Sequence, residues 1–197
     1  MNPVRNFSIG KEEISNGMKK NKTIILGVTG SIAAYKACDI VNKLRAKGHQ
    51  VFVIMTKEAQ QFITPLSLQT LSANKVFCDM FAPVESWDPV HTSLADKADV
   101  VLIAPCSANI IGKLAHGICD DLLTCVAIAT DAPKVIAPAM NEKMYANKVV
   151  KENIAKLTGL GYKFVGPTKG HLACGHVGIG HIATTEDIVK QVEALFR

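Results

Sequence analysis

The sequence contains no apolar run of the roughly 18 residues that a membrane-spanning helix requires. Its first 22 residues, MNPVRNFSIGKEEISNGMKKNK, also lack the apolar central region of a signal peptide. Both absences argue against a membrane or secreted protein, and we expect a cytoplasmic protein without a membrane partner. With 48% hydrophobic and 20% charged residues in a chain of 197, the composition suits one globular domain with a sizeable core.

Paired cysteines are missing as well. The six cysteines include no CxxC pair, and in a cytosolic protein of this size we expect them to be reduced. The stretch HLACGHVGIGH could hold a metal through His171, Cys174, His176 and His181. Ligands separated by one residue strain a tetrahedral site, however, and no second cysteine is near. We therefore predict no metal, and the alternative is a glycine-rich flap that carries one cysteine over a bound ligand.

The surplus of positive charge is small and uneven. The net charge is +5, of which the first 22 residues supply +3 and the remaining 175 residues only +2. A basic leader could bind nucleic acid, but the globular part shows no basic stripe. We expect residues 1–21 to be a disordered leader, residues 22–197 to form the domain, and no nucleic-acid partner.

Short apolar runs, several of them β-branched, alternate with helical patterns along the chain. The predicted strands cover residues 22–26, 51–55, 100–104, 134–140 and 162–165. The predicted helices cover residues 32–48, 66–74, 91–98, 118–130, 148–160 and 184–196. This alternation implies right-handed crossovers between parallel strands. The predicted fold class is α/β: a single Rossmann-like (flavodoxin-like) domain with a parallel sheet and helices on both faces.

Small and polar residues follow four of the predicted strands. Because ligands of open parallel sheets bind just beyond the carboxyl ends of the strands, we expect these residues to surround one flat ligand. They are Gly30, Ser31, Thr56, Ser107, Ala108, Asn109, Met140 and Asn141.

Two interpretations of these residues stay open. Ser31, in the turn GVTGS, can direct its hydroxyl and a helix N-terminus at a phosphate, but a tight turn without a ligand is the alternative. The turn is not GxGxxG, so no dinucleotide is implied. Thr56, Ser107 and Asn141 are also good helix N-caps in their own right.

His91 and the stretch of residues 166–182 are further candidates. The imidazole of a histidine titrates near neutral pH and suits a proton acceptor, although a lone histidine can equally be a surface or capping residue. Residues 166–182 hold five glycines without a periodic pattern, and a loop of this length is usually functional or disordered.

Five stretches, in order and spacing, resemble the homo-oligomeric flavin-containing cysteine decarboxylases. They are GVTGSIAAYK, the histidine before LADKADVVLIAP, PCSANIIGKLAHGICDDLLT, PAMNEKMY and GHLACGHVGIG. The resemblance covers about residues 22–197 and is strongest to members that act in coenzyme A biosynthesis. It implies a Rossmann-like flavoprotein whose cofactor is FMN.

The resemblance also implies roles for individual residues. His91 matches the catalytic histidine of the family, Asn141 matches the asparagine that holds the substrate carboxylate, and Cys174 matches the proton-donating cysteine of the flap. FMN would be held by a neighbouring subunit and by Gly30, Ser31, Thr56, Ser107, Ala108, Asn109 and Met140. The implied assembly is a trimer, or a dodecamer built from trimers, with shared active sites.

The implied reaction is the FMN-dependent oxidative decarboxylation of phosphopantothenoylcysteine, followed by reduction to 4'-phosphopantetheine. Oxidation next to the sulfur creates an electron sink beside the departing CO2, and the cofactor carries this chemistry. The alternatives are a peptidyl-cysteine decarboxylase and a non-catalytic regulatory flavoprotein subunit. Cys174 argues against the first alternative, and the presence of both Asn141 and Cys174 argues against the second.

The sequence departs from the family pattern at a few positions. Cys106 and Ile110 stand where alanine and threonine are frequent, and Tyr145 stands where tryptophan is usual. His181 and Ile182 stand where the flap often has Arg-Met, which puts in question how the flap holds the substrate phosphate. The chain resembles the single-function form rather than members that carry a second, ligase domain.

Overall fold

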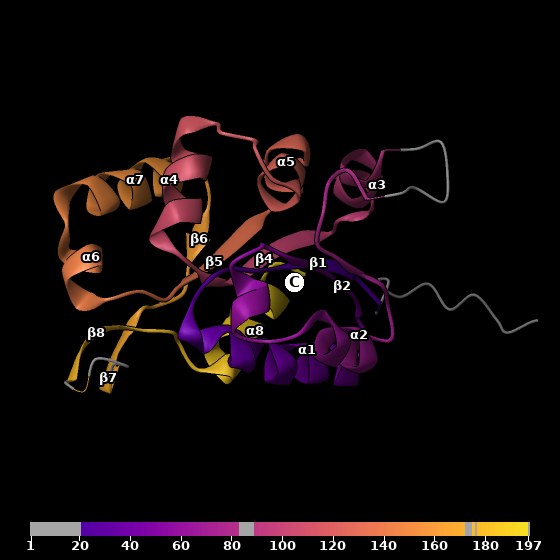
Figure 1. Cartoon of the computed structure of the whole chain (residues 1–197), viewed down its shortest axis with the longest axis horizontal. Helices are drawn as coiled ribbons and strands as arrows, with labels where there is room; N and C mark the ends of the chain where they lie inside the picture. Colours follow the sequence, from indigo (N-terminus) through magenta and orange to yellow (C-terminus); the bar gives the residue numbers. More distant parts are fainter. Residues whose placement is uncertain (1–20, 83–88, 172–174, 176, 197) are drawn as a thin grey trace, which may run out of the picture.

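The computed structural model describes residues 21–82, 89–171, 175 and 177–196. The predicted leader, apart from Asn21, lies outside this range, so its disorder stays a prediction. Within the described chain, a central sheet separates two layers of helices (Figure 1). None of the helices in this part of the chain combines the length and apolar content that crossing a membrane would need.

The central sheet has six strands in the order β3-β2-β1-β4-β5-β6, and every neighbouring pair is parallel. This is the strand order of a Rossmann fold, in which the order reverses between β1 and β4. The predicted fold class is therefore confirmed. The strands are β1 (Thr23–Val28), β2 (Gln50–Met55), β3 (Val76–Phe77), β4 (Val100–Cys106), β5 (Lys134–Pro138) and β6 (Lys163–Phe164).

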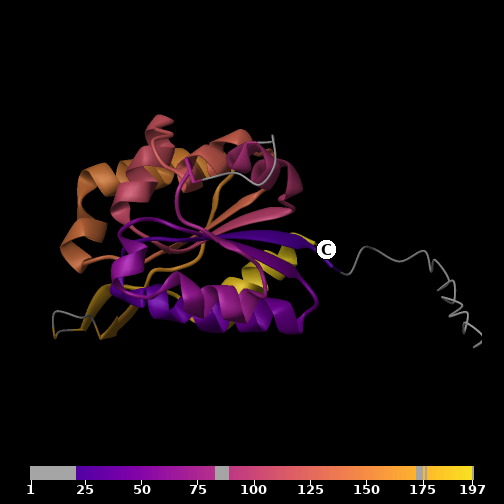
Figure 2. The ribbon, with the colours of Figure 1, turned by 45° about the vertical axis from the view of Figure 1, so that its right-hand side comes forward.

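Helices cover both faces of this sheet (Figure 2). One face carries the 3-10 helix η1 (Ile32–Tyr35) with α1 (Lys36–Ala46), α2 (Pro65–Ser72) and α8 (Thr185–Ala194). The other face carries α3 (Val90–Lys97), α4 (Ala108–His116), α5 (Leu122–Ala129) and α7 (Lys148–Gly159). Two short turns of helix, η2 (Ala59–Gln61) and α6 (Glu142–Ala146), follow β2 and β5.

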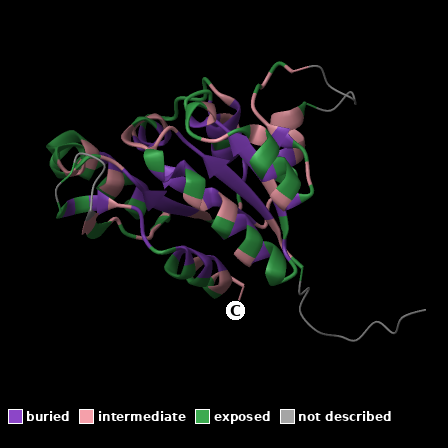
Figure 3. Cartoon of the chain, turned by 60° about the horizontal axis from the view of Figure 1, so that its bottom comes forward, coloured by how far each residue is buried: buried purple, intermediate pink, exposed green. Residues whose placement is uncertain are grey.

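The core lies between the sheet and these two helical layers (Figure 3). Because side chains alternate along a strand, Ile24, Leu26 and Val28 of β1 pack on the α1 side, whereas Ile25 packs on the opposite side. All four are fully buried. A strand that is buried on both faces reads as a continuous apolar run, which is why β1, β2 and β4 could be predicted from the sequence.

A second, two-stranded antiparallel sheet lies outside the main sheet. It consists of β7 (Thr168–His171) and β8 (Val177–His181). Residues 166–182, which showed no periodic pattern in the sequence, thus contain a β-hairpin rather than an irregular loop. Residues 172–174 and 176 of this segment lie outside the described residues.

Several elements differ from the sequence prediction. β3 was not predicted, whereas β6, which is equally short, lies within the strand predicted at residues 162–165. The helix α4 was not predicted after the residues PCSAN, although its apolar residues Ile110, Ile111 and Leu114 are buried on one side. β1 extends through Gly27 and Val28, which were assigned to the following turn.

Gly27 generates a first prediction, because β1 and α5 approach closely there. A methyl group at Gly27 would overlap the side chain of Leu123, which is itself buried. We expect Gly27→Ala to lower the free energy of unfolding by about 1–3 kcal/mol, the usual cost of overpacking a core. Urea denaturation of the single variants and of Gly27→Ala/Leu123→Ala measures this. The double variant should lose less stability than the sum of the two single variants, whereas strict additivity would show that the two groups do not compete for space.

Candidate functional site

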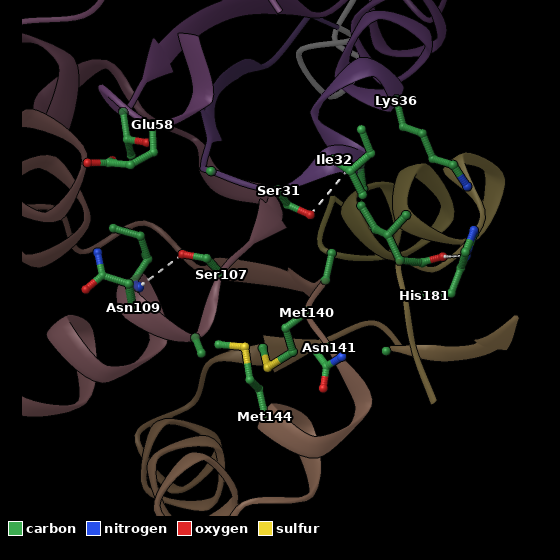
Figure 4. A pocket seen from close by; sticks show the side chains of 18 of the residues that line it. Ser31, Ile32, Lys36, Glu58, Ser107, Asn109, Met140, Asn141, Met144 and His181 are labelled. Atoms are coloured by element: carbon green, nitrogen blue, oxygen red, sulfur yellow. Dashed lines mark hydrogen bonds between the residues drawn. The ribbon is translucent and has the colours of Figure 1, made fainter. Parts of the chain in front are cut away.

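A cavity of about 780 Å³ opens at the carboxyl ends of β1, β2, β4 and β5 (Figure 4). This is the edge where ligands of open parallel sheets bind, and the volume is typical of small-molecule sites. Figure 4 shows Ser107 and Asn109 on one side of the hollow and His181 on the other. The predicted residues that line it are Gly30, Ser31, Thr56, Ser107, Ala108, Asn109, Met140 and Asn141.

The turn after β1 contributes Gly30 and Ser31. A β-carbon added at Gly30 would lie 2.5 Å from Cβ of Glu58, so only glycine lets this turn pack against the residues that follow β2. The hydroxyl of Ser31 accepts a hydrogen bond from the backbone N–H of Ala33 at 3.3 Å and caps η1. The start of a helical turn therefore faces the cavity, as the GVTGS motif predicted.

Thr29 connects this turn to the neighbouring one. Its hydroxyl donates to the carbonyl of Pro105 at 2.8 Å and accepts from the backbone N–H of Ser107 at 2.9 Å. Thr29 is fully buried, so these partners replace the water that it loses. The sequence analysis did not single out Thr29, although a hydroxyl residue directly after a buried strand was the signal that identified Thr56.

The turn after β4 leads into α4. The hydroxyl of Ser107 accepts from the backbone N–H of Ile110 at 3.5 Å, which makes Ser107 the N-cap of α4. The register of β4 against β5 shifts between Ile103 and Cys106, a local irregularity that is frequent beside functional sites. Full burial raises the pKa of the Cys106 thiol, so this cysteine stays neutral and acts as a packing residue.

The other two strand ends contribute Thr56 and Asn141. The hydroxyl of Thr56 accepts from the N–H of Ala59 at 3.3 Å, at the start of η2. The amide oxygen of Asn141 accepts from the N–H of Lys143 at 2.9 Å and caps α6. The capping interpretation is therefore confirmed for Asn141, whereas the N-cap of η2 is Glu58 and Thr56 lies two residues before it. Both Thr56 and Asn141 line the cavity.

The hairpin supplies the remaining wall. Gly180, His181 and Ile182 line the cavity, and the backbone N–H of Met140 donates to the carbonyl of Gly180 at 3.1 Å. A ring nitrogen of His181 lies 2.8 Å from the carbonyl of Ile182. Further lining residues that the sequence analysis missed are Ile32, Ala33, Tyr35, Lys36, Glu58, Ala139 and Met144. Their apolar or charged character alone gave no signal, because surface helices contain the same residue types.

Of the other predicted catalytic residues, one lies away from this cavity and one is outside the described part of the chain. His91, the second residue of α3, is partly buried and is not among the residues that line this cavity. Cys174 lies outside the described residues, as do Leu172, Ala173 and His176. In the described part of the chain, no three histidine, cysteine, aspartate or glutamate residues are placed to hold a metal ion.

Residues 12–197 match the model of the Flavoprotein family. The bifunctional coenzyme A biosynthesis protein CoaBC of Bacillus subtilis is 46% identical over 179 residues, which are 91% of this chain but 44% of that protein. The chain thus spans less than half of the length of this bifunctional relative. A probable phosphopantothenoylcysteine decarboxylase of Streptococcus mutans is 46% identical over 174 residues, which are 87% of this chain and 97% of that protein.

Solved structures agree with the sequence relatives. A mutant PPC decarboxylase in complex with pantothenoylaminoethenethiol is 32% identical, with a TM-score of 0.81 over 89% of this chain and 98% of that one. The FMN-dependent cysteine decarboxylase SpaF is 27% identical, with a TM-score of 0.74 over 87% and 97% of the two chains. The predicted resemblance is therefore confirmed. The chain belongs to the Flavoprotein family, as a relative of the phosphopantothenoylcysteine decarboxylases.

Proposed function

We propose that the chain is an FMN-dependent decarboxylase that converts phosphopantothenoylcysteine to 4'-phosphopantetheine in coenzyme A biosynthesis. The observation that carries this proposal is the convergence of eight predicted residues, from four strand ends, on one cavity. The names of the relatives in Bacillus subtilis and Streptococcus mutans support the same activity.

The residues of the cavity fit FMN. Ser31 and Ser107 stand at the starts of η1 and α4, where a hydroxyl and a helix N-terminus favour a phosphate. Ala139, Met140 and Ile182 offer small or apolar surface for a flat ring system. When bound, FMN supplies the two-electron redox chemistry that creates an electron sink next to the substrate carboxylate.

Asn141 is suited to orient that carboxylate. Its side chain is exposed at the cavity and fixed by its cap on α6. An amide is neutral, so it can hold a carboxylate in place without the strong ground-state stabilisation that a lysine or arginine would give. Since the carboxylate must leave as CO2, that stabilisation would oppose the reaction.

A second copy of the chain is proposed to complete the site. His91 is assigned as the base but does not line the cavity formed by its own chain. The side chains of Ile32 and Tyr35 line the cavity and are 59% and 60% exposed, which provides apolar surface at its mouth for a neighbouring subunit. A trimer, or a dodecamer built from trimers, would place His91 of one copy against the cavity of another.

The cofactor assignment predicts a selective effect of the serine at the start of α4. We expect Ser107→Ala to weaken FMN binding roughly tenfold, because a hydroxyl that contacts a charged phosphate is lost. The matched control is Thr184→Ala, which removes the N-cap of α8 at a site that does not line the cavity. Cofactor extraction with mass spectrometry, followed by flavin titration of the apoprotein, measures both. Stoichiometric zinc without flavin would refute the assignment.

The shared-site assignment predicts complementation between inactive variants. His91→Asn should retain FMN but leave it oxidised when substrate is added anaerobically, because the proton acceptor is gone. Asn141→Ser keeps an N-cap for α6 but loses the amide, and should also be inactive. Co-expression of the two variants should restore part of the activity if His91 acts on another copy. No activity in the mixture, with correctly assembled protein, would place His91 and Asn141 in a site within one chain.

The proton-donor assignment predicts where a Cys174 variant stops. Cys174→Ser should still oxidise and decarboxylate the substrate, and should then accumulate an ene-thiol that lacks two hydrogens relative to phosphopantetheine. The reason is that a serine hydroxyl is a much weaker acid than a thiol, and a positioned acid is worth about 10²–10⁴ in rate. The relative that was solved as a mutant with pantothenoylaminoethenethiol supports this outcome. Anaerobic single-turnover mass spectrometry measures it, and phosphopantetheine at the wild-type rate would remove the role from Cys174.

A further inference from the structure

Strand β8 reaches the edge of the cavity at Gly180. Gly178 and Gly180 are buried, whereas Val177 and Ile179 between and beside them are about half exposed. A β-carbon at Gly180 would overlap the carbonyl oxygen of Met140, so at this point backbone lies directly against backbone. Any larger residue at Gly180 would push β8 away from the segment that carries Met140 and Asn141.

The other glycine of β8, Gly178, packs against the carboxylate of Glu142. A β-carbon at Gly178 would lie 2.7 Å from the carboxyl carbon of Glu142 and would overlap one of its oxygens. The other oxygen accepts from the backbone N–H of Ile179 at 3.4 Å. This hydrogen bond is long, and the contact also requires that residue 178 has no side chain. Glu142 is partly buried and is the first residue of α6.

Glu142 therefore joins two walls of the cavity without lining it. The residue before it, Asn141, belongs to one wall, and Gly180 and His181, which follow Ile179, belong to the other. The Met140–Gly180 backbone bond is the second polar connection between these walls that the structure describes. A shift of the Glu142 carboxylate changes the separation of Asn141 and β8 without removing any group that faces the cavity.

We propose that Glu142 is a positioning residue that sets the distance between Asn141 and the β8 wall and thereby the grip on the substrate. This inference rests on the proposed decarboxylase function. It assigns no chemical step to Glu142. The competing explanation is local: a carboxylate in the first turn of α6 favours the helix start and has no effect on β8.

The first experiment compares Glu142→Ala and Glu142→Gln with Glu152→Ala, which removes an exposed carboxylate from α7. We expect Glu142→Ala to raise KM for phosphopantothenoylcysteine about tenfold, the scale of one lost hydrogen bond, with FMN content unchanged. Glu142→Gln keeps an acceptor oxygen and should recover most of the loss. If Glu142→Ala behaves like the Glu152 control in an active enzyme, the inference is wrong. A wild-type protein that releases no CO2 would instead refute the proposed function.

A second measurement tests the contact without relying on activity. Hydrogen exchange of the FMN-loaded protein should become faster at residues 177–181 in Glu142→Ala, because Ile179 loses its acceptor. The local explanation predicts faster exchange in α6 alone. In addition, Gly178→Ala should make exchange at residues 177–181 no faster in the Glu142→Ala background, because the carboxylate that the new methyl group would displace is already absent. Additive effects of the two substitutions would contradict the proposed contact.

Discussion

The geometry of the cavity depends on two hydrogen bonds of the Thr29 hydroxyl. This hydroxyl joins the turn after β1 to the turn after β4 through bonds to Pro105 and Ser107, at 2.8 and 2.9 Å. A buried hydroxyl that lost its partners would cost about 1–3 kcal/mol, so both turns are fixed relative to each other. Ser31 and Ser107 consequently stand at a set separation, and a ligand that contacts both turns meets donors already in place.

Polar residues at this edge serve the helices and the cavity with the same side chain. Ser31, Thr56 and Ser107 each accept a hydrogen bond from a backbone N–H of the turn that follows. A hydroxyl that accepts in this way still carries a hydrogen that it can donate. The cap also fixes the side-chain rotamer, which lowers the entropy lost when a ligand binds. Helix capping and ligand binding, which the sequence analysis treated as alternatives, are therefore compatible uses of one residue.

The sequence predicted five of the six strands of the main sheet and much of the cavity lining because both follow from local rules. Buried strands give apolar runs, and the carboxyl ends of parallel strands lie at the same edge of the sheet. The residues that follow four strands, among them Gly30 and Asn141, could therefore be grouped without knowing their distances. β3 was missed because the apolar stretch at residues 76–78 is only three residues long, shorter than the run of about four to eight residues that indicates a strand. β8 was missed because the residues that it buries at every second position are glycines, Gly178 and Gly180. A search for alternating apolar side chains does not detect them. The place of His91 relative to the cavity is a tertiary property that no local pattern contains.

The two walls of the cavity differ in how firmly they are attached to the core. The wall of strand ends belongs to the main sheet, whose residues Ile103 and Leu102 are fully buried, so moving it would disrupt the core. The other wall includes β8, which pairs only with β7 among the described strands. Segments with few buried apolar contacts open at a lower free energy than the core. Under the proposed function, the rigid wall of strand ends would hold the cofactor, and the separately attached β8 wall would allow the substrate to exchange in each turnover.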